Sequence, residues 1–225
     1  KLANELKTEK YDLAIVPHRS LRSALLVWGS GIPRRIGFAN SAGWFMYTDR
    51  VVYKRDGRHE IDRLLDLLGP FGYQREETYP EIYPDKEDVE KIDRILSMGP
   101  VLPLYGIAPG SVWGTKRWIP ERFAEICRRL SDKGRVYLIG GKEDIPLCDK
   151  ISQMAGVNVL NFAGSMTIRQ SAELIGRSKI ILTNDTAPLH MAVAMRTPVV
   201  AIFGATVPEF GFFPYGNKNK VIETA

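Results

Sequence analysis

The segment NDTAPLHMAVAMRTPVVAIFG, residues 184–204, indicates the fold of this chain. A run of β-branched and apolar residues at 179–183 precedes it, and a second apolar run at 198–203 closes it. Between the two runs, Pro188 and the apolar residues that follow predict a helix over about 187–195. A buried strand, a helix and a second buried strand form a βαβ unit, in which the strands are parallel and the crossover is right-handed.

The same alternation of apolar strands and amphipathic helices extends over the whole chain. In the second half, strands are predicted at 104–108, 135–139, 157–160, 179–183 and 198–203, with a sixth near Val221 and Ile222. Helices are predicted between them at about 120–132, 143–154, 168–176 and 187–195. In the first half, strands are predicted at 11–16 and 34–38, and helices at 19–29, at 58–69 and in the charged segment ending near Leu96. This pattern predicts an α/β fold of parallel sheets that helices cover on both faces.

Two domains are expected, an incomplete α/β domain over residues 1–99 and a Rossmann-like domain over 100–225. The segment MGPVLP at 98–103 reads as the linker between them. The first domain has the second half of a Rossmann-like pattern, without its first strand and first loop. We therefore expect a chain that is truncated at both ends.

The composition is that of an ordinary globular protein, with 44% hydrophobic and 25% charged residues. No apolar run approaches the roughly 18 residues that span a bilayer. The charged start KLANELKTEKYD predicts a helix and not a signal peptide. Cys127 and Cys148 stand in helical patterns without a CxxC spacing, which favours a packing role over a metal site or a disulfide.

The positive charge is concentrated at the start of the chain. Residues 1–60 hold eleven Lys or Arg and six Asp or Glu, whereas residues 61–99 hold five and ten. A basic surface suits nucleic acid, anionic lipid or a phosphorylated substrate, or it is simply solvated. Nucleic acid is not expected as a partner, because the basic residues lack interleaved aromatics and no nucleic-acid motif is present.

The loop PGSVWGTKRW, residues 109–118, follows the first strand of the second half. Ligands of open α/β sheets bind at the carboxyl ends of the strands. A lysine beside hydroxyls and bare amides suits a phosphate, so Ser111, Thr115 and Lys116 are candidates, and Gly110 would let backbone approach a ligand. The spacing is not that of a Walker motif, and a simple loop with an exposed lysine remains an alternative.

Two further loops carry candidate residues for a nucleotide. GGKED at 140–144 begins a helix with Gly140 and Gly141, and Glu143 is placed to bind ribose hydroxyls. The alternative for Glu143 is an acid that complements the helix dipole. Met166, in the loop GSMT, either covers a base or fills the core.

The segment 184–204 itself supplies the fourth group of candidates. Asp185 or Thr186 is expected to cap the helix that Pro188 begins, and the backbone amides there form an anion site. Ala187 leaves room for a ligand, and His190 lies about one turn further on. Capping, helix initiation and a satisfied histidine are the structural alternatives, but four such loops at one sheet edge favour a ligand site.

Several of these segments together resemble glycosyltransferase family nine, the ADP-heptose:lipopolysaccharide heptosyltransferases, and in particular their heptosyltransferase II group. The segments are APGSVWGTKRW, GGKED, AGSMT and NDTAPLHMAVAMRTPVVAIFGATVP in the second half, with HRSLRSALL (18–26) and RRIGF (34–38) in the first. The resemblance covers nearly all of the chain. It implies the GT-B fold, in which two Rossmann-like domains flank a donor cleft.

The resemblance also implies roles for individual residues. The expected donor-binding residues are Ser111, Thr115, Lys116, Gly140, Gly141, Glu143, Met166, Asp185, Thr186, Ala187 and His190. Among them, Lys116 would stabilise the leaving diphosphate, Glu143 would contact the ribose and Met166 the adenine. The segment 185–187 would contact the diphosphate and heptose. The family's general base lies in a loop that precedes this chain, so we expect weak donor binding and no turnover from the chain alone.

The implied reaction is an inverting transfer of heptose from ADP-heptose to the anionic inner core of lipopolysaccharide. No cofactor is expected, and no carboxylate cluster resembles a metal site. The acceptor-side candidates are Arg19, Arg22, Arg34, Arg35 and Arg58. The family implies a cytoplasmic protein at the inner face of the inner membrane, in peripheral contact with it. The alternatives are another nucleotide-sugar enzyme on the same scaffold, such as an epimerase, and a noncatalytic nucleotide-binding module.

Overall fold

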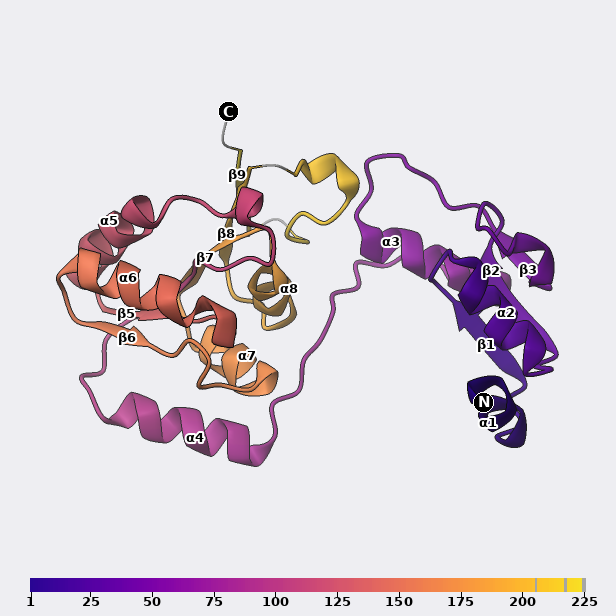
Figure 1. The fold of residues 1–225 in the computed structure, drawn as a ribbon, viewed down its shortest axis with the longest axis horizontal. Coiled ribbons are helices and arrows are strands. Elements are labelled where there is room, and N and C mark those ends of the chain that lie inside the picture. Colours follow the sequence, from indigo (N-terminus) through magenta and orange to yellow (C-terminus); the bar gives the residue numbers. More distant parts are fainter. Residues whose placement is uncertain (205, 217, 224–225) are drawn as a thin grey trace. The chain divides into compact units, whose positions relative to one another are not determined.

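The structure is a computed structural model that describes residues 1–204, 206–216 and 218–223. The chain divides into two compact units, Lys1–Thr78 and Tyr79–Ala225, each with its own parallel sheet (Figure 1). The α/β class predicted from the sequence is therefore confirmed.

The second unit is built on a parallel sheet that, within the described residues, has six strands in the order β6-β5-β4-β7-β8-β9. The strands are β4 (Leu104–Ala108), β5 (Arg135–Leu138), β6 (Val159–Asn161), β7 (Ile180–Asn184), β8 (Val199–Phe203) and β9 (Lys220–Glu223). The chain starts in the middle of the sheet, moves outward to β6, and then returns to the other side of β4. The strand order reverses between β4 and β7, where doubly wound folds open a crevice for ligands.

Helices cover both faces of this sheet (Figure 1). They are α4 (Lys86–Ser97), α5 (Pro120–Ser131), α6 (Ile145–Ala155), α7 (Ile168–Gly176) and α8 (Ala187–Ala194), with 3-10 turns η3 (Gly114–Lys116), η4 (Lys142–Asp144) and η5 (Pro208–Phe210). Phe123 of α5 and Ile151 of α6 are buried in one apolar cluster, and Leu174 of α7 and Ala192 of α8 in the other. The predicted elements of this unit lie within about two residues of the observed ones, including the sixth strand.

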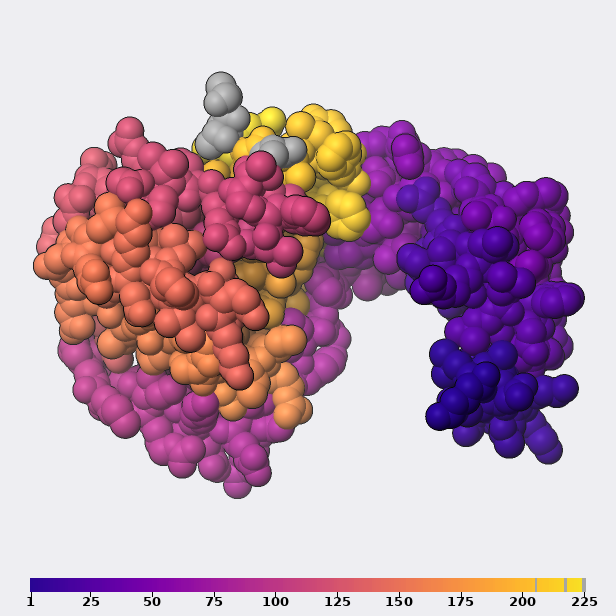
Figure 2. All heavy atoms as spheres, viewed as in Figure 1, coloured from indigo at the N-terminus to yellow at the C-terminus, as the bar shows by residue number. Residues whose placement is uncertain are grey.

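Helix α4 belongs to the second unit, although the sequence predicted a domain boundary after this helix, at residue 99. Ile92 is fully buried in the same cluster as the inner residues of α7. Arg169 of α7 also approaches α4, with its Nε 3.1 Å from Asp88 Oδ2. Figure 2 shows the magenta atoms of α4 beside the orange atoms of α7. The observed division after residue 78 therefore differs from the predicted one after residue 99, because the apolar face of α4 needs this sheet to be buried.

The variant Ile92→Val tests this role of α4. Removing one methylene from a fully buried site is expected to lower the free energy of unfolding by about 1 kcal/mol. Chemical denaturation followed by circular dichroism measures the change. Glu90→Ala, on the exposed side of the same helix, is the control and should change stability much less. Equal effects of the two variants would mean that α4 is not packed as described.

The first unit has three parallel strands in the order β1-β2-β3 in the part of the chain that the structure describes. Its elements are α1 (Leu2–Thr8), β1 (Leu13–Val16), α2 (Leu21–Gly29), β2 (Arg34–Phe38), η1 (Trp44–Met46), β3 (Asp49–Val51), α3 (Glu60–Leu65) and η2 (Asp66–Phe71). The continuous helix predicted over 58–69 is wrong. It ends at Leu65 and continues as a 3-10 turn, because Gly69 and Pro70 disfavour a regular α-helix. The short strand β3 was not predicted.

Both cysteines pack in the core of the second unit. Cys127 and Cys148 are free and fully buried, and burial raises the pKa of their thiols to about 11 and about 12. The packing role predicted for them fits these values, because a thiol with such a pKa is not ionised near neutral pH. No helix in the described residues is long and apolar enough to cross a membrane.

Candidate functional site

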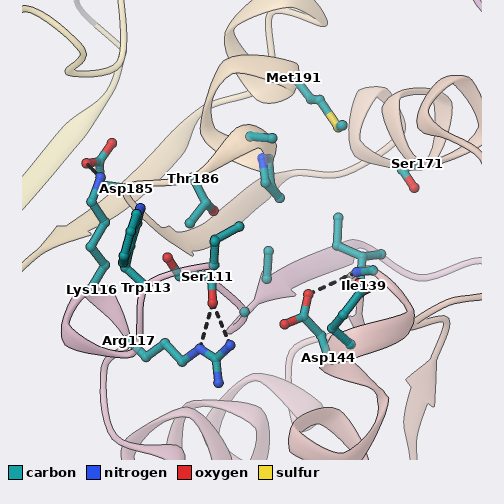
Figure 3. A pocket seen from close by; sticks show the side chains of 18 of the residues that line it. Ser111, Trp113, Lys116, Arg117, Ile139, Asp144, Ser171, Asp185, Thr186 and Met191 are labelled. Carbon is teal, nitrogen blue, oxygen red and sulfur yellow. Dashed lines mark hydrogen bonds and ion pairs between the residues drawn. The ribbon is translucent and has the colours of Figure 1, made fainter.

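A cavity of about 600 Å³ opens in the second unit where β4, β5 and β7 end. Ligand pockets commonly have volumes of about 300–1,000 Å³. Figure 3 shows Lys116 and Asp185 together at one end of the cavity, with Asp144 and Ser171 toward the other. The cavity therefore lies at the switch point of the sheet, and residues from four separate loops contribute to it.

Most of the predicted donor residues line this cavity. They are Ser111, Lys116, Gly140, Gly141, Glu143, Met166, Asp185, Thr186 and Ala187. Thr115 and His190 do not line it. Thr115 is exposed within the turn η3. In α8, Met191 lines the cavity in place of His190, because a step of four residues after Ala187 returns closer to the same helix face than a step of three.

His190 is instead a half-buried residue of α8. Burial lowers the pKa of its imidazole, and the nearby carboxylate of Asp185 partly offsets this effect. The position of His190 thus fits the alternative given in the sequence analysis, a histidine with a structural role and not a donor-binding role.

An ion pair closes one end of the cavity. The ammonium Nζ of Lys116 lies 2.6 Å from Oδ2 of Asp185, whose side chain is only 9% exposed. The hydroxyl of Thr206, in the loop after β8, donates a hydrogen bond of 2.8 Å to the same oxygen. Lys116 therefore reaches the cavity while its charge is balanced by a buried carboxylate. Thr206 was not predicted, because only the tertiary structure brings its loop to Asp185.

The first turn of α8 presents the backbone amide of Ala187, because Pro188 has no N–H and the amide of Leu189 donates to the carbonyl oxygen of Thr186 at 3.0 Å. Thr186 is the N-cap residue by backbone conformation, but its hydroxyl makes no capping hydrogen bond. It lies 3.3 Å from the hydroxyl of Thr183 instead. The capping role expected for Asp185 or Thr186 is therefore wrong, since Asp185 is held by Lys116. The uncapped helix start leaves the amide of Ala187 and the positive end of the helix dipole for an anion.

Asn184 joins the two sides of the switch point. Its side chain is fully buried, and Nδ2 donates to the carbonyl oxygen of Pro109 at 2.8 Å. Its Oδ1 accepts from the backbone amide of Trp118 at 3.1 Å. Arg117 adds a second brace, because its guanidinium donates to the carbonyl oxygen of Ser111 at 2.8 and 2.5 Å. These contacts fix the loop that carries Lys116 to the end of β7.

Asp144 is a second residue that the sequence did not single out. Its Oδ2 accepts a hydrogen bond of 2.9 Å from the amide of Gly141. A Cβ on Gly110 would come within 2.3 Å of the Asp144 carboxyl group, and one on Gly140 within 2.7 Å of its Cβ. The missing side chain at Gly110 therefore makes room for Asp144, and Gly110 itself lines the cavity.

The acceptor-side arginines lie in the first unit, and most of them are engaged within it. Arg58 pairs with Asp56 and Asp66, and Arg34 pairs with Asp49. Arg35 and Arg19 have partners that are not acidic. Arg35 donates to backbone carbonyls such as that of Met46, and the guanidinium of Arg19 lies 4.0 Å from the ring centroid of Tyr53. The remaining candidate, Arg22, is exposed on α2. The charges of Arg34 and Arg58 are thus already neutralised by carboxylates.

In the part of the chain that the structure describes, no three His, Cys, Asp or Glu side chains are grouped to hold a metal ion.

The fold is shared with glycosyltransferases of the GT-B type, as the comparison with solved structures shows. The structure of E. coli ADP-heptose lipopolysaccharide heptosyltransferase II superposes with a TM-score of 0.82 and 28% identity, over 98% of this chain and 70% of that chain. The crystal structure of a family 9 glycosyltransferase from Veillonella parvula DSM 2008 has the same fold, with a TM-score of 0.89 and 24% identity over 99% of this chain and 66% of that chain.

The chain belongs to glycosyltransferase family 9 (heptosyltransferase), because the sequence model of that family matches residues 1–225. Lipopolysaccharide heptosyltransferase 2 of Escherichia coli K12 is 29% identical over an alignment of 238 positions, which covers 99% of this chain and 68% of that protein. The chain thus spans about two thirds of the length of these relatives. The predicted family and the predicted glycosyltransferase class are confirmed, and neither the epimerase nor the noncatalytic module is favoured.

Proposed function

We propose that the protein transfers heptose from ADP-heptose to the inner core of lipopolysaccharide, with inversion at the sugar carbon. The observation that carries the proposal is the pairing of Lys116 with Asp185 beside the open start of α8, at the switch point of a family 9 fold. A lysine ammonium and the backbone amide of Ala187 at one end of a nucleotide-sized cavity suit a diphosphate. The heptosyltransferase II relative is named for ADP-heptose, a donor that contains a diphosphate.

We assign each part of the donor to a wall of the cavity as part of this proposal. The diphosphate is placed at Lys116 and the amide of Ala187, where positive charge and helix dipole coincide. The ribose is placed near Glu143 and the adenine near Met166, which packs on the apolar cluster beside α7. Asp185 is placed to accept from sugar hydroxyls once Lys116 turns toward the phosphates.

The proposed reaction is a direct displacement in which negative charge develops on the departing diphosphate. Lys116 and the start of α8 stabilise that charge, so the proposal includes no metal and no other cofactor. Asp185 is not proposed as the general base, because its carboxylate accepts from both Lys116 and Thr206. A base must be near the acceptor hydroxyl that it deprotonates.

The acceptor is proposed to be an anionic core glycolipid. The excess of basic residues in 1–60 suits its carboxylates and phosphates. Arg19, Arg22 and Arg35 are the acceptor-side candidates that have no carboxylate partner among the described residues. We place the protein in the cytoplasm, in peripheral contact with the inner face of the inner membrane where such a glycolipid is assembled. Nucleic acid is not part of the proposal.

Isothermal titration calorimetry with ADP and ADP-heptose tests the donor assignment. ADP is expected to bind, with UDP as the weaker control nucleotide and with unchanged affinity in the presence of a chelator. Absence of ADP binding at millimolar concentration would contradict the proposal. Incubation of ADP-heptose without acceptor separates transfer from epimerisation, since an epimerase alters the sugar and a transferase does not.

Thr206→Val is expected to weaken ADP binding about fivefold. Without the Thr206 hydroxyl, Asp185 retains Lys116 as its main partner, and releasing the lysine to the diphosphate costs about 1 kcal/mol more. Calorimetry with ADP measures the change, and Thr206→Ser, which retains the hydroxyl, serves as the control. If the valine and serine variants bind equally well, Thr206 does not tune the ion pair.

A further inference from the structure

Trp113 is a large aromatic residue that lines the cavity and takes no part in the core of the second unit. Its side chain is 67% exposed. Among the residues that the structure describes, its ring has no hydrogen bond, aromatic contact or cation partner. Trp118, later in the same loop, packs instead against Phe123, with ring centroids 5.2 Å apart. The fold therefore uses one tryptophan of this loop for packing and presents the other to the cavity.

The loop that carries Trp113 is held by hydrogen bonds at both ends. The side chain of Asn184 ties the first and the last residue of the loop to the end of β7. Between these bonds, the backbone amide of Lys116 donates to the carbonyl oxygen of Trp113 at 3.0 Å, which closes the turn η3. The indole thus extends from a braced backbone, which is what a residue that orients a ligand requires.

The turn η3 also places Trp113 at the Lys116 end of the cavity. Figure 3 shows this end, with Asp144 and Ser171 toward the other. In the proposed placement of the donor, the adenine lies near Met166 and the diphosphate at Lys116. The sugar of a sugar nucleotide is attached to the diphosphate on the side away from the nucleoside. The heptose therefore falls at the end of the cavity that Trp113 lines.

An aromatic ring and a carboxylate together are complementary to a sugar. A pyranose ring bears hydroxyls around its edge and C–H groups on its faces, and these hydrogens are slightly positive because their carbons are bonded to oxygen. The face of an indole is negative, so it attracts such C–H groups and shields them from water. The carboxylate of Asp185, which pairs with Lys116 at the same end, can accept from the hydroxyls.

We propose that the indole of Trp113 stacks on the heptose ring of the donor and so favours the sugar nucleotide over the nucleotide alone. The inference rests on the proposed function, because it takes ADP-heptose as the donor. Lys116 and the start of α8 cannot supply this preference, since they are placed at the diphosphate, which ADP and ADP-heptose share. The inference requires only that one face of the ring lines the cavity, so contacts at the other face do not affect it.

Calorimetry with two ligands separates the sugar contact from the rest of the site, because ADP and ADP-heptose differ only in the sugar. Trp113→Ala is expected to raise the dissociation constant for ADP-heptose about tenfold, since several weak contacts to C–H groups are lost together. The same variant should change the dissociation constant for ADP less than about twofold. Trp113→Phe keeps an aromatic face and should stay within about threefold of the unmodified chain for both ligands.

The matched control is Trp28→Ala, because Trp28 is a tryptophan of similar exposure, 57%, that lies on α2 and does not line the cavity. This variant should bind both ligands like the unmodified chain. Thermal unfolding shows that each variant is folded. Retained ADP binding by Trp113→Ala shows in addition that its nucleotide site is intact.

Three results would overturn the inference. Equal weakening of ADP and ADP-heptose in Trp113→Ala would place the ring at the nucleoside or the diphosphate. Unchanged affinity for both ligands would mean that the ring does not contact the donor, and a raised Michaelis constant for the glycolipid would then assign it to the acceptor. Both results leave the proposed function intact. An unmodified chain that binds neither ligand would contradict the proposed function, and the inference with it.

Discussion

Replacing Lys116 with alanine is expected to raise the dissociation constant for ADP-heptose by about ten- to a hundredfold. A hydrogen bond between charged groups contributes about 1.5–3 kcal/mol, and Lys116 is the cation proposed to meet the diphosphate. The transfer rate of the protein as its gene encodes it should fall at least as much, because the same charge stabilises the leaving group. Calorimetry and a transfer assay with a core glycolipid measure the two effects.

The same variant should also be less stable. Asp185 is 9% exposed and, among the described residues, would keep the Thr206 hydroxyl as its side-chain hydrogen-bond partner. The loss of Lys116 is expected to lower the free energy of unfolding by about 1–2 kcal/mol. Lys116→Arg retains the charge and should recover much of the affinity. Lys142→Ala, on a nearby exposed lysine outside the cavity lining, is the matched control. An unchanged transfer rate in Lys116→Ala would contradict the proposal that the diphosphate binds at this loop.

Asn184→Ala is expected to reduce both stability and donor affinity. The variant leaves the carbonyl oxygen of Pro109 and the amide of Trp118 without their hydrogen-bond partner in a buried setting. The free energy of unfolding should fall by about 2–4 kcal/mol, which lowers the melting temperature by about 5–10 °C in a unit of this size. ADP binding should weaken as well, since the loop that carries Lys116 is then released from β7.

Differential scanning calorimetry with and without ADP measures both consequences. Asn161→Ala is the control, because Asn161 is likewise the last residue of a strand but donates to the more exposed Asp149. That variant should lose less than about 1 kcal/mol. A melting temperature of Asn184→Ala equal to that of the control would show that the asparagine does not join the loop to the strand.

Much of the second unit was predictable from local sequence. The segments that became β4 and α7 have observed ends at 104–108 and 168–176, as predicted, because apolar periodicity and turn residues act within each element. The first unit was less predictable. The helix over 58–69 was expected to be continuous, but Gly69 and Pro70 weaken the regular pattern, and the three-residue strand β3 has too short a signal to detect.

For the candidate site too, features that depend on neighbouring residues were predicted, and features that depend on residues far apart in the chain were not. Sequence reasoning found several of the residues that line the cavity at the ends of β4, β5 and β7, because ligand loops follow strands in this class of fold. It missed Asn184, Asp144 and Thr206, whose roles depend on contacts with other segments. It also placed His190 in the cavity, where the helix geometry instead places Met191.

The sequence by itself determined the order of strands and helices, the parallel sheets, and the family. These properties follow from periodicity and short motifs, which reflect burial along single elements. Only the tertiary structure decided that α4 joins the second unit and that Lys116 pairs with Asp185 across 69 positions of the chain. Such pairings depend on how the whole sheet packs, since a distant partner leaves no periodic signal in the local sequence.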